Sequence, residues 1–222
     1  LRMSDGGGVQ WVKRYGISNT PNDSFWGVVQ ADDGGFVLAG EKLQDRNFEF
    51  YDHFWVVKTD ENGNIQWSHE LGGSLWDEAN DIKILSDDSY IITGKKSISS
   101  TNLNMWVMRI SSDGTILWQA DHGNSNYDTG TSLTVSENEE IIAVVGYTRN
   151  SSTSPFKYRI WGVDVATGQI IWNRIHGGNL DDKALGVVES YHQGFSIVGS
   201  SYSFGSDRVN WLVKTNSSGN IY

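Results

Sequence analysis

Short apolar runs alternate along the chain with turns rich in Gly, Asn and Asp. Four of these runs are apolar almost throughout and end in glycine: Phe36–Gly40, Tyr90–Gly94, Ile142–Gly146 and Phe195–Gly199. A short continuous apolar run between turns is typical of a strand buried on both faces. A glycine at the end of such a run marks a close approach of two backbones. The pattern therefore predicts an all-β protein whose sheets pack face to face.

The apolar runs belong to a repeat of about fifty residues that is marked by two tryptophans. The first recurs at Trp55, Trp106, Trp161 and Trp211, and the second at Trp11, Trp67, Trp118 and Trp172, with Tyr222 in the equivalent place. Each unit holds strand-like runs joined by hairpin signals such as Asn62-Gly63 and Asp113-Gly114. A repeat of this length predicts a β-propeller of four-stranded antiparallel blades.

The repeat units fall at about 23–71, 77–122, 128–176 and 182–222, within a single domain that spans residues 1–222. The fourth unit stops inside its last strand, and the N-terminal segment 9–15 has the pattern of the missing piece. We expect this strand to complete the last blade and close a ring of four blades, because closure removes exposed sheet edges. The alternative is that the four units belong to an array of seven or eight blades.

The charge and composition exclude several classes of protein. The net charge is −10 and the pI is near 4.8, with the Lys and Arg residues scattered along the chain. Nucleic-acid binders normally carry a basic patch, and an acidic surface disfavours anionic membranes. No apolar run approaches the ~18 residues of a membrane span, and no signal peptide is recognised. The chain has no cysteine, which excludes disulfides and zinc–thiolate sites.

One segment resembles a known repeat motif. Residues 162–172 read GVDVATGQIIW, in which Asp164, Thr167, Gly168 and Trp172 match the tryptophan-docking motif of the quinoprotein-like (PQQ-like) β-propellers. The whole chain is also similar to the W-V-V-K-T-D-x-x-G-N-I-x-W repeats of uncharacterised secreted bacterial and archaeal proteins.

This resemblance implies a packing role for one set of tryptophans. Trp67, Trp118 and Trp172 would dock between neighbouring blades, and Trp11 would serve the closing blade. The resemblance does not imply the quinone cofactor, because the sequence shows no calcium-and-base constellation and no vicinal cysteines.

An aspartate opens the first strand of every unit, at Asp23, Asp77, Asp128 and Asp182. First strands of a propeller converge on its axis, so these four carboxylates would ring one mouth of the channel. Oxygen ligands of this kind suit a divalent cation such as calcium, and no other cofactor is expected. The alternative is that each aspartate accepts hydrogen bonds from turn amides of its own repeat.

The loops that join successive units are predicted to share one face with the loops between second and third strands. These loops differ in length and composition, and variable loops on a rigid scaffold are where binding residues concentrate. They carry the aromatic residues Trp76, Tyr127, Tyr51, Phe48, Phe156 and Tyr202. Exposed aromatic faces suit sugar rings or a protein partner. The alternative is that the rings pack beneath their own loops.

The sequence contains no nucleophile elbow, zinc-protease motif or phosphate-binding loop. His122 and His176 share one repeat position, on outer strands too far apart for a common metal, and are expected to be structural. We therefore expect a non-catalytic extracellular or cell-surface propeller that binds a protein or glycan partner through its loop face. The alternatives are a polysaccharide-active lyase or hydrolase, and a structural module of a larger adhesin, filament or surface layer.

Overall fold

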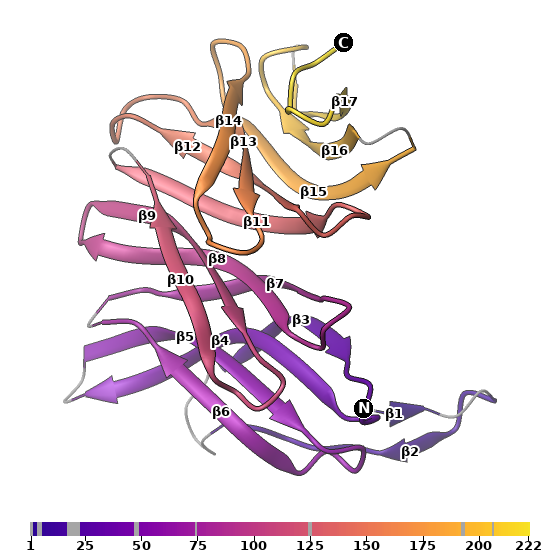
Figure 1. Cartoon of the computed structure of the whole chain (residues 1–222). Helices are drawn as coiled ribbons and strands as arrows, with labels where there is room; N and C mark the ends of the chain where they lie inside the picture. The colour runs from indigo at the N-terminus through magenta and orange to yellow at the C-terminus, as the bar shows by residue number, and fades with distance from the viewer. Residues whose placement is uncertain are drawn as a thin grey trace.

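The computed structural model describes residues 2–3, 6–16, 23–46, 49–73, 75–123, 126–191, 194–205 and 207–222. These residues form seventeen β-strands and no helix (Figure 1), which confirms the prediction of an all-β protein. Accordingly, none of the described residues belongs to a helix of the length and apolarity needed to cross a membrane.

Apart from a two-stranded N-terminal sheet, the strands fall into four antiparallel groups that follow one another along the chain. We call each group a sheet, although the second and third are hydrogen-bonded into one eight-stranded sheet. The first sheet is β3 (Ser24–Gln30), β4 (Phe36–Arg46), β5 (Glu49–Thr59) and β6 (Ile65–Leu71). The second is β7 (Glu78–Ile84), β8 (Tyr90–Ser99), β9 (Asn102–Ile110) and β10 (Ile116–His122). The third is β11 (Tyr127–Val135), β12 (Ile141–Arg149), β13 (Lys157–Asp164) and β14 (Ile170–His176). The fourth is β15 (Asp182–Ser190), β16 (Gly194–Ser201) and β17 (Val209–Thr215).

Within each sheet, consecutive strands pair antiparallel, and the second and third sheets are also joined by one parallel contact, between Tyr127 and Leu103. The predicted close approach at the glycines is confirmed at Gly40 and Gly94. A Cβ atom at either position would lie 1.9 Å from a carbonyl oxygen of the first strand. Only a residue without a side chain fits there.

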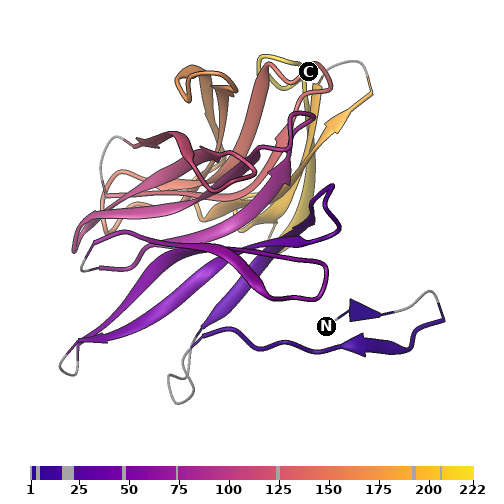
Figure 2. The same cartoon turned by 60° about the horizontal axis from the view of Figure 1, so that its bottom comes forward.

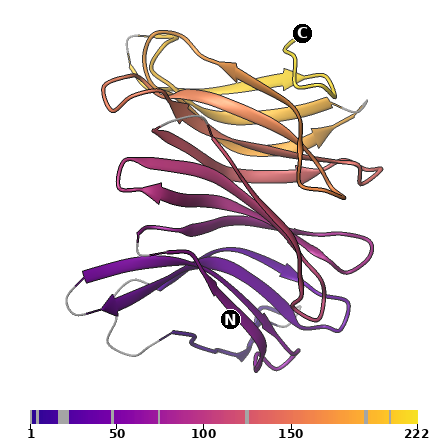
Figure 3. The ribbon, with the colours of Figure 1, turned by 60° about the vertical axis from the view of Figure 1, so that its left-hand side comes forward.

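The apolar core lies in three layers between successive sheets, which are stacked one above another (Figures 1 and 3). Ile82 and Val56 belong to the layer between the first and second sheets. Leu133 and Val107 belong to the next layer, and Ile160 with Val187 to the last. Each of the two inner sheets contributes side chains to the layers on both of its faces, so its central strands are apolar throughout.

A tryptophan on the fourth strand of each of the first three sheets packs against the next sheet. Trp118 lies on Gly168 and donates its indole N–H to Val165 O at 3.1 Å. Trp67 lies on Gly114 and donates to Ser112 O at 3.0 Å, and Trp172 lies against Gly219. These contacts stabilise the stack at its outer edge, because each joins a strand to a turn about fifty residues further along the chain.

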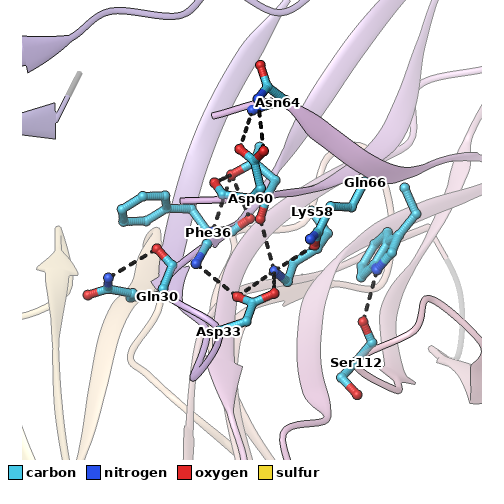
Figure 4. A network of polar contacts seen from close by, with 12 residues as sticks. Gln30, Asp33, Phe36, Lys58, Asp60, Asn64, Gln66 and Ser112 are labelled. Atoms are coloured by element: carbon cyan, nitrogen blue, oxygen red, sulfur yellow. Dashed lines mark hydrogen bonds and ion pairs between the residues drawn. The ribbon is translucent and has the colours of Figure 1, made fainter. Parts of the chain in front are cut away.

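A buried lysine lies opposite Trp67 in the ladder between β5 and β6 and holds the first sheet together at this end (Figure 4). Lys58 is 2% exposed, and its Nζ lies 2.6 Å from Asp33 Oδ2. The ammonium also donates to Thr59 O and Gln66 Oε1, both at 2.9 Å. All three of its protons therefore have acceptors, as a buried ammonium requires.

The predicted ring closure by the N-terminal strand is not formed. The strand β2 (Val9–Trp11) pairs with β1 (Arg2–Met3) rather than with β17, and this hairpin lies beside the first sheet (Figure 2). Trp11 packs edge-on against Phe36, and Tyr15 donates its hydroxyl to Gly63 O at 2.9 Å. Segment 9–15 thus packs against the first sheet in the way that the fourth strand of each of the first three sheets, with its tryptophan, packs against the next sheet.

The alignment of Tyr222 with the docking tryptophans is wrong by one residue. Ile221 bridges Thr215 in the same way that Ile65 pairs with Thr59. Tyr222 is therefore equivalent to Gln66, which precedes Trp67. The turn after Thr215 follows that after Thr59, and this common turn sets the register of the strands.

The first and last sheets each expose a face that the inner sheets bury. Val28 on β3 is 61% exposed, although Ile82 and Leu133, which pair at the same register position, are buried. On β17, Leu212 is 71% exposed, whereas the equivalent Val56 and Val107 are fully buried. The four sheets are thus an open stack with an apolar surface at each end.

The sequence pattern predicts loops between the second and third strands at residues 43–53 and 97–104, and both are shorter in the structure. Strands β4 and β5 continue to the pair Arg46–Glu49, so the expected loop 43–53 is largely a hairpin. Strands β8 and β9 likewise continue to the pair Ser99–Asn102 within the expected loop 97–104. Polar residues in these segments favour a loop, but a two-stranded extension beyond the core tolerates them on both faces.

Candidate functional site

The four first-strand aspartates occupy equivalent places, and each carboxylate is bonded within its own repeat. Asp77 accepts hydrogen bonds from Gly73 N at 2.8 Å and from Ser97 N at 2.6 Å. Asp182 accepts from Gly178 N at 2.7 Å and from the Ser203 hydroxyl at 2.8 Å. Each of these carboxylates ties the segment that enters the sheet to the end of its second strand.

The other two aspartates make related contacts. Asp23 accepts from Leu43 N at 3.0 Å, and buried Asp128 is paired with Arg159 Nη1 at 2.8 Å. No group of three or more His, Asp or Glu side chains in the described part of the chain is arranged to hold a metal ion. The contacts fit the architectural alternative, and the cation ring stays a prediction.

A charged cluster lies where the first and second sheets meet. Lys95 is 2.9 Å from Glu78, and Glu78 and Asp52 act electrostatically on Glu41. Burial, with the repulsion of Asp52 and Glu78, raises the pKa of Glu41 to about 7. Burial likewise raises the pKa of Asp52. Glu41 can therefore exchange a proton near neutral pH, which is the property of a general acid or base.

Two of the predicted aromatic residues, Tyr127 and Phe156, are in ring contact. Trp76 is 59% exposed and lies just before β7, and Tyr51 is half-buried on β5. Phe48 lies outside the described residues. Tyr127, Phe156 and Tyr202 are the members that lie on the third and fourth sheets and their loops.

Tyr127 and Phe156 form an aromatic cluster with Tyr147, which the sequence did not suggest. The Tyr127 and Tyr147 rings are stacked with centroids 5.7 Å apart. Phe156 meets both edge-on, at 5.4 and 5.1 Å. These rings pack largely against each other. The alternative, in which the rings pack beneath their own loops, therefore describes them better than exposure of their faces to a partner. Burial raises the pKa of both tyrosines, which keeps their hydroxyls neutral.

Two cations cover this aromatic cluster. The Arg149 guanidinium lies 4.6 Å from the centre of the Phe156 ring, and Lys183 Nζ lies 4.5 Å from the same centre. Lys183 also lies 4.7 Å from the Tyr147 ring, and Arg149 lies 5.6 Å from Tyr127. Such cation–π contacts are worth about 0.5–1 kcal/mol each near a surface, and they fix both side chains in place.

A groove opens beside the cluster, between the third and fourth sheets. One part is a cavity of about 700 Å³ whose lining includes Arg149, Phe156, Asp181 and Tyr202. A smaller part of about 220 Å³ shares Asp181 and Tyr202, and adds Lys183 and Arg208. We call the two parts together the loop-face groove. Both lie on the face formed by the loops after β12, β14 and β16.

The loop-face groove is positively charged within an acidic protein. Arg149, Lys183 and Arg208 line it, against the single carboxylate of Asp181. None of these three cations belongs to a salt bridge of the described residues, and seven other Lys and Arg residues do. Cations of this kind bind anionic groups such as carboxylates.

The groove was only partly foreseeable from the sequence. Phe156 and Tyr202 were predicted from their loops, but Arg149 and Lys183 were missed. Arg149 opens one of the predicted loops, and Lys183 directly follows the repeated aspartate Asp182. The sequence could have indicated the groove, because it places a cation at the start of a loop in one repeat and next to the repeated aspartate in the following repeat.

A second apolar cavity of about 430 Å³ lies at the open end of the stack. Trp11, Tyr15, Trp26 and Val28 are among its lining residues. It coincides with the face that inner sheets bury, so we assign it to packing rather than to a ligand site.

Comparison with known proteins gives no family. No family model and no curated protein matches the chain. Among solved structures, a protein of unknown function from Bacteroides caccae is similar over 89% of this chain and 79% of that one, with a TM-score of 0.39 and 10% identity. The tail fiber of Staphylococcus aureus phage P68 is similar over 89% of this chain and 50% of its own, with a TM-score of 0.31 and 9% identity.

Proposed function

We propose that this chain is a non-catalytic binding module whose partner docks in the loop-face groove. The observation that carries the proposal is the set of three cations, none in a salt bridge of the described residues, beside a rigid aromatic cluster. Binding sites on repeat scaffolds characteristically lie on one face, where the loops vary while the strands do not. The groove also combines the apolar side chains of Phe156 and Leu180 with polar groups, as ligand sites do.

We further infer that the four sheets are blades of a β-propeller of the quinoprotein-like tryptophan-docking type. The three docking contacts of Trp67, Trp118 and Trp172 support this inference, since each links one sheet to the next in the same way. The exposed apolar faces at Val28 and Leu212 favour the larger array of seven or eight blades, in which further blades would cover them. The similarity to repeats of secreted proteins supports an extracellular or cell-surface location.

A polysaccharide-active enzyme is the second candidate, and Glu41 is the observation that favours it. Its pKa of about 7 and its proximity to the Glu78 carboxylate are suited to acid–base chemistry. Incubation with a panel of polysaccharides would reveal turnover, and loss of that turnover in Glu41→Gln would support an enzyme. Binding without turnover supports the module.

The binding proposal is tested by comparing the protein with a loop-face variant on an array of neutral and acidic glycans. Tyr202 is 45% exposed and lines both parts of the groove, so Tyr202→Ala should weaken binding without disturbing the core. Tyr191→Ala is the matched control, because Tyr191 is 88% exposed and does not line the groove.

We expect at least one ligand class whose binding falls in Tyr202→Ala and persists in Tyr191→Ala. Equal binding by both variants would overturn a role for the loop-face groove. Turnover of a bound glycan by the unaltered protein would instead favour the enzyme.

A further inference from the structure

The charge of the loop-face groove identifies the chemistry of its ligand. Arg149, Lys183 and Arg208 face a groove that contains one carboxylate, and Asp181 is itself engaged, since its Oδ1 accepts from Phe156 N at 2.8 Å. The whole chain carries a net charge of −10. A locally positive groove attracts anions, although the rest of this acidic protein repels them.

Two of the cations are held ready for a ligand. Arg149 and Lys183 are both fixed over the Phe156 ring, and Arg149 also donates through Nη1 to Ser152 O at 3.3 Å. The Arg149 Nε is buried and makes no hydrogen bond to a described residue. Because these side chains are already ordered, binding costs little additional side-chain entropy.

The walls of the groove favour a sugar over a peptide. Ser152, Thr153, Ser154 and Asn179 offer hydroxyl and amide groups that can exchange hydrogen bonds with sugar hydroxyls. Tyr202 presents a half-exposed ring on which a sugar face can stack. Protein partners instead anchor on large apolar or aromatic side chains in enclosed pockets, and this groove is open.

The shape of the groove favours a chain over a single sugar. Its two parts share Asp181 and Tyr202, so they adjoin each other, with Arg149 lining one part and Arg208 the other. Charges spaced over two adjoining cavities are matched by a polymer with repeated anionic groups.

We propose that the loop-face groove binds an anionic polysaccharide whose carboxylate or sulfate groups pair with Arg149, Lys183 and Arg208. This proposal rests on the proposed function and adds the class of ligand. The sugar hydroxyls contact the Ser152–Ser154 segment, and Tyr202 stacks on one ring.

Calorimetric titration with four polymers tests the ligand class: polygalacturonate, dextran sulfate, neutral dextran and poly-glutamate. The proposal expects binding of polygalacturonate or dextran sulfate, with an affinity that falls as salt is raised from 50 to 500 mM because salt screens ion pairs. Binding of only the carboxylate polymer or only the sulfate polymer identifies the source of the anion. Salt-independent binding of dextran, or equal affinity for poly-glutamate, would overturn the proposal.

Variants test the residues. Arg208→Gln should weaken binding by about tenfold, the loss expected for one charge-assisted hydrogen bond. Lys183→Met should do the same, because it removes the charge and leaves an unbranched apolar side chain beside Phe156. Arg208 is exposed and distant from the core, so its variant stays folded even where Lys183→Met does not. Arg14→Gln removes one exposed charge from the N-terminal segment and should leave the affinity unchanged.

The outcomes distinguish failure of the anion proposal from failure of the proposed function. If Arg14→Gln weakens binding as much as Arg208→Gln, the anion proposal is overturned because net charge alone explains it. If neutral glycans bind and Tyr202→Ala abolishes that binding, the groove is a ligand site but the anionic class is wrong. If no glycan of any charge depends on Tyr202, the proposed function itself fails.

Discussion

Trp118 of the second sheet covers Gly168 of the third so closely that a Cβ atom on the glycine would lie 2.6 Å from the indole ring. The glycine also has a φ of +73°, which an L side chain rarely adopts. The same residue is therefore required twice, once by its own turn and once by the neighbouring sheet. Trp67 on Gly114 and Trp172 on Gly219 join the other neighbouring sheets in the same way.

Replacing Gly168 by alanine should destabilise the fold by about 2 kcal/mol, since strain at positive φ adds to displacement of the indole. Urea denaturation of the two proteins measures the difference. Gly73→Ala is the control, because no atom lies within 4 Å of a Cβ there. An equal, small effect of both substitutions would mean that the docking contact contributes little to stability.

Asp33→Asn should destabilise the protein by about 2 kcal/mol at pH 7, because buried Lys58 loses its only carboxylate partner among the described residues. The hydrogen bond from Lys58 lowers the pKa of Asp33. Its stabilising effect is therefore present above the ordinary carboxyl pKa of ~3.9 and is lost as pH falls through the lowered folded-state value.

Denaturation at pH 7 and at pH 3 measures this dependence. The difference between the two proteins should be smaller at pH 3. A difference that is the same at both pH values would show that the loss comes from packing and not from the ion pair.

Glu41→Gln should stabilise the protein above pH 7 by about 1 kcal/mol, after allowance for solvent screening of this partly exposed group. The pKa of Glu41 is raised to about 7, so the folded protein holds a proton that the unfolded chain has already lost. Stability of the unaltered protein therefore falls as pH rises from about 4.5 to about 7.

Thermal unfolding at pH 5 and pH 8 checks this dependence. The gain in Glu41→Gln should be larger at pH 8, and Glu137→Gln, which alters an exposed carboxyl, should change little. A gain at pH 5 that matches the gain at pH 8 would contradict the assigned pKa.

Asp77→Asn should lower stability by about 1–3 kcal/mol in EDTA and in calcium alike, because the carboxylate accepts two backbone hydrogen bonds. Differential scanning fluorimetry in the two buffers gives the comparison. Loss of stability in calcium alone would support a cation bound by the ring of first-strand aspartates.

The sequence predicted the repeat well where one residue type serves one local purpose. The apolar runs and the glycines that end them follow from side-chain size and periodicity, whereas the packing role of Trp118 was suggested by the resemblance to the tryptophan-docking repeats. Ring closure was not predictable, because it depends on the angle between successive sheets, and a repeat pattern does not encode this angle. The alignment of Tyr222 was wrong because matching aromatic residues along the chain allows an error of one residue, whereas the turn before the strand fixes its register.

The candidate site was likewise predictable only in part. Tyr202 and Phe156 could be suggested from their loops, but the groove also needs Arg149 and Lys183, which come from different sheets. Side chains of this kind meet only after the sheets have packed, so no spacing along the chain reveals them. Their shared ring, Phe156, became informative only with the distances to both cations.

The location of the binding surface is the most direct test of the whole account. Titration of the isotopically labelled protein with polygalacturonate or dextran sulfate, followed by NMR, maps the residues whose signals shift. We predict that the shifts centre on Arg149, Lys183 and Tyr202. Shifts confined to Val28 and Leu212, at the open ends of the stack, would contradict a binding site on the loop face.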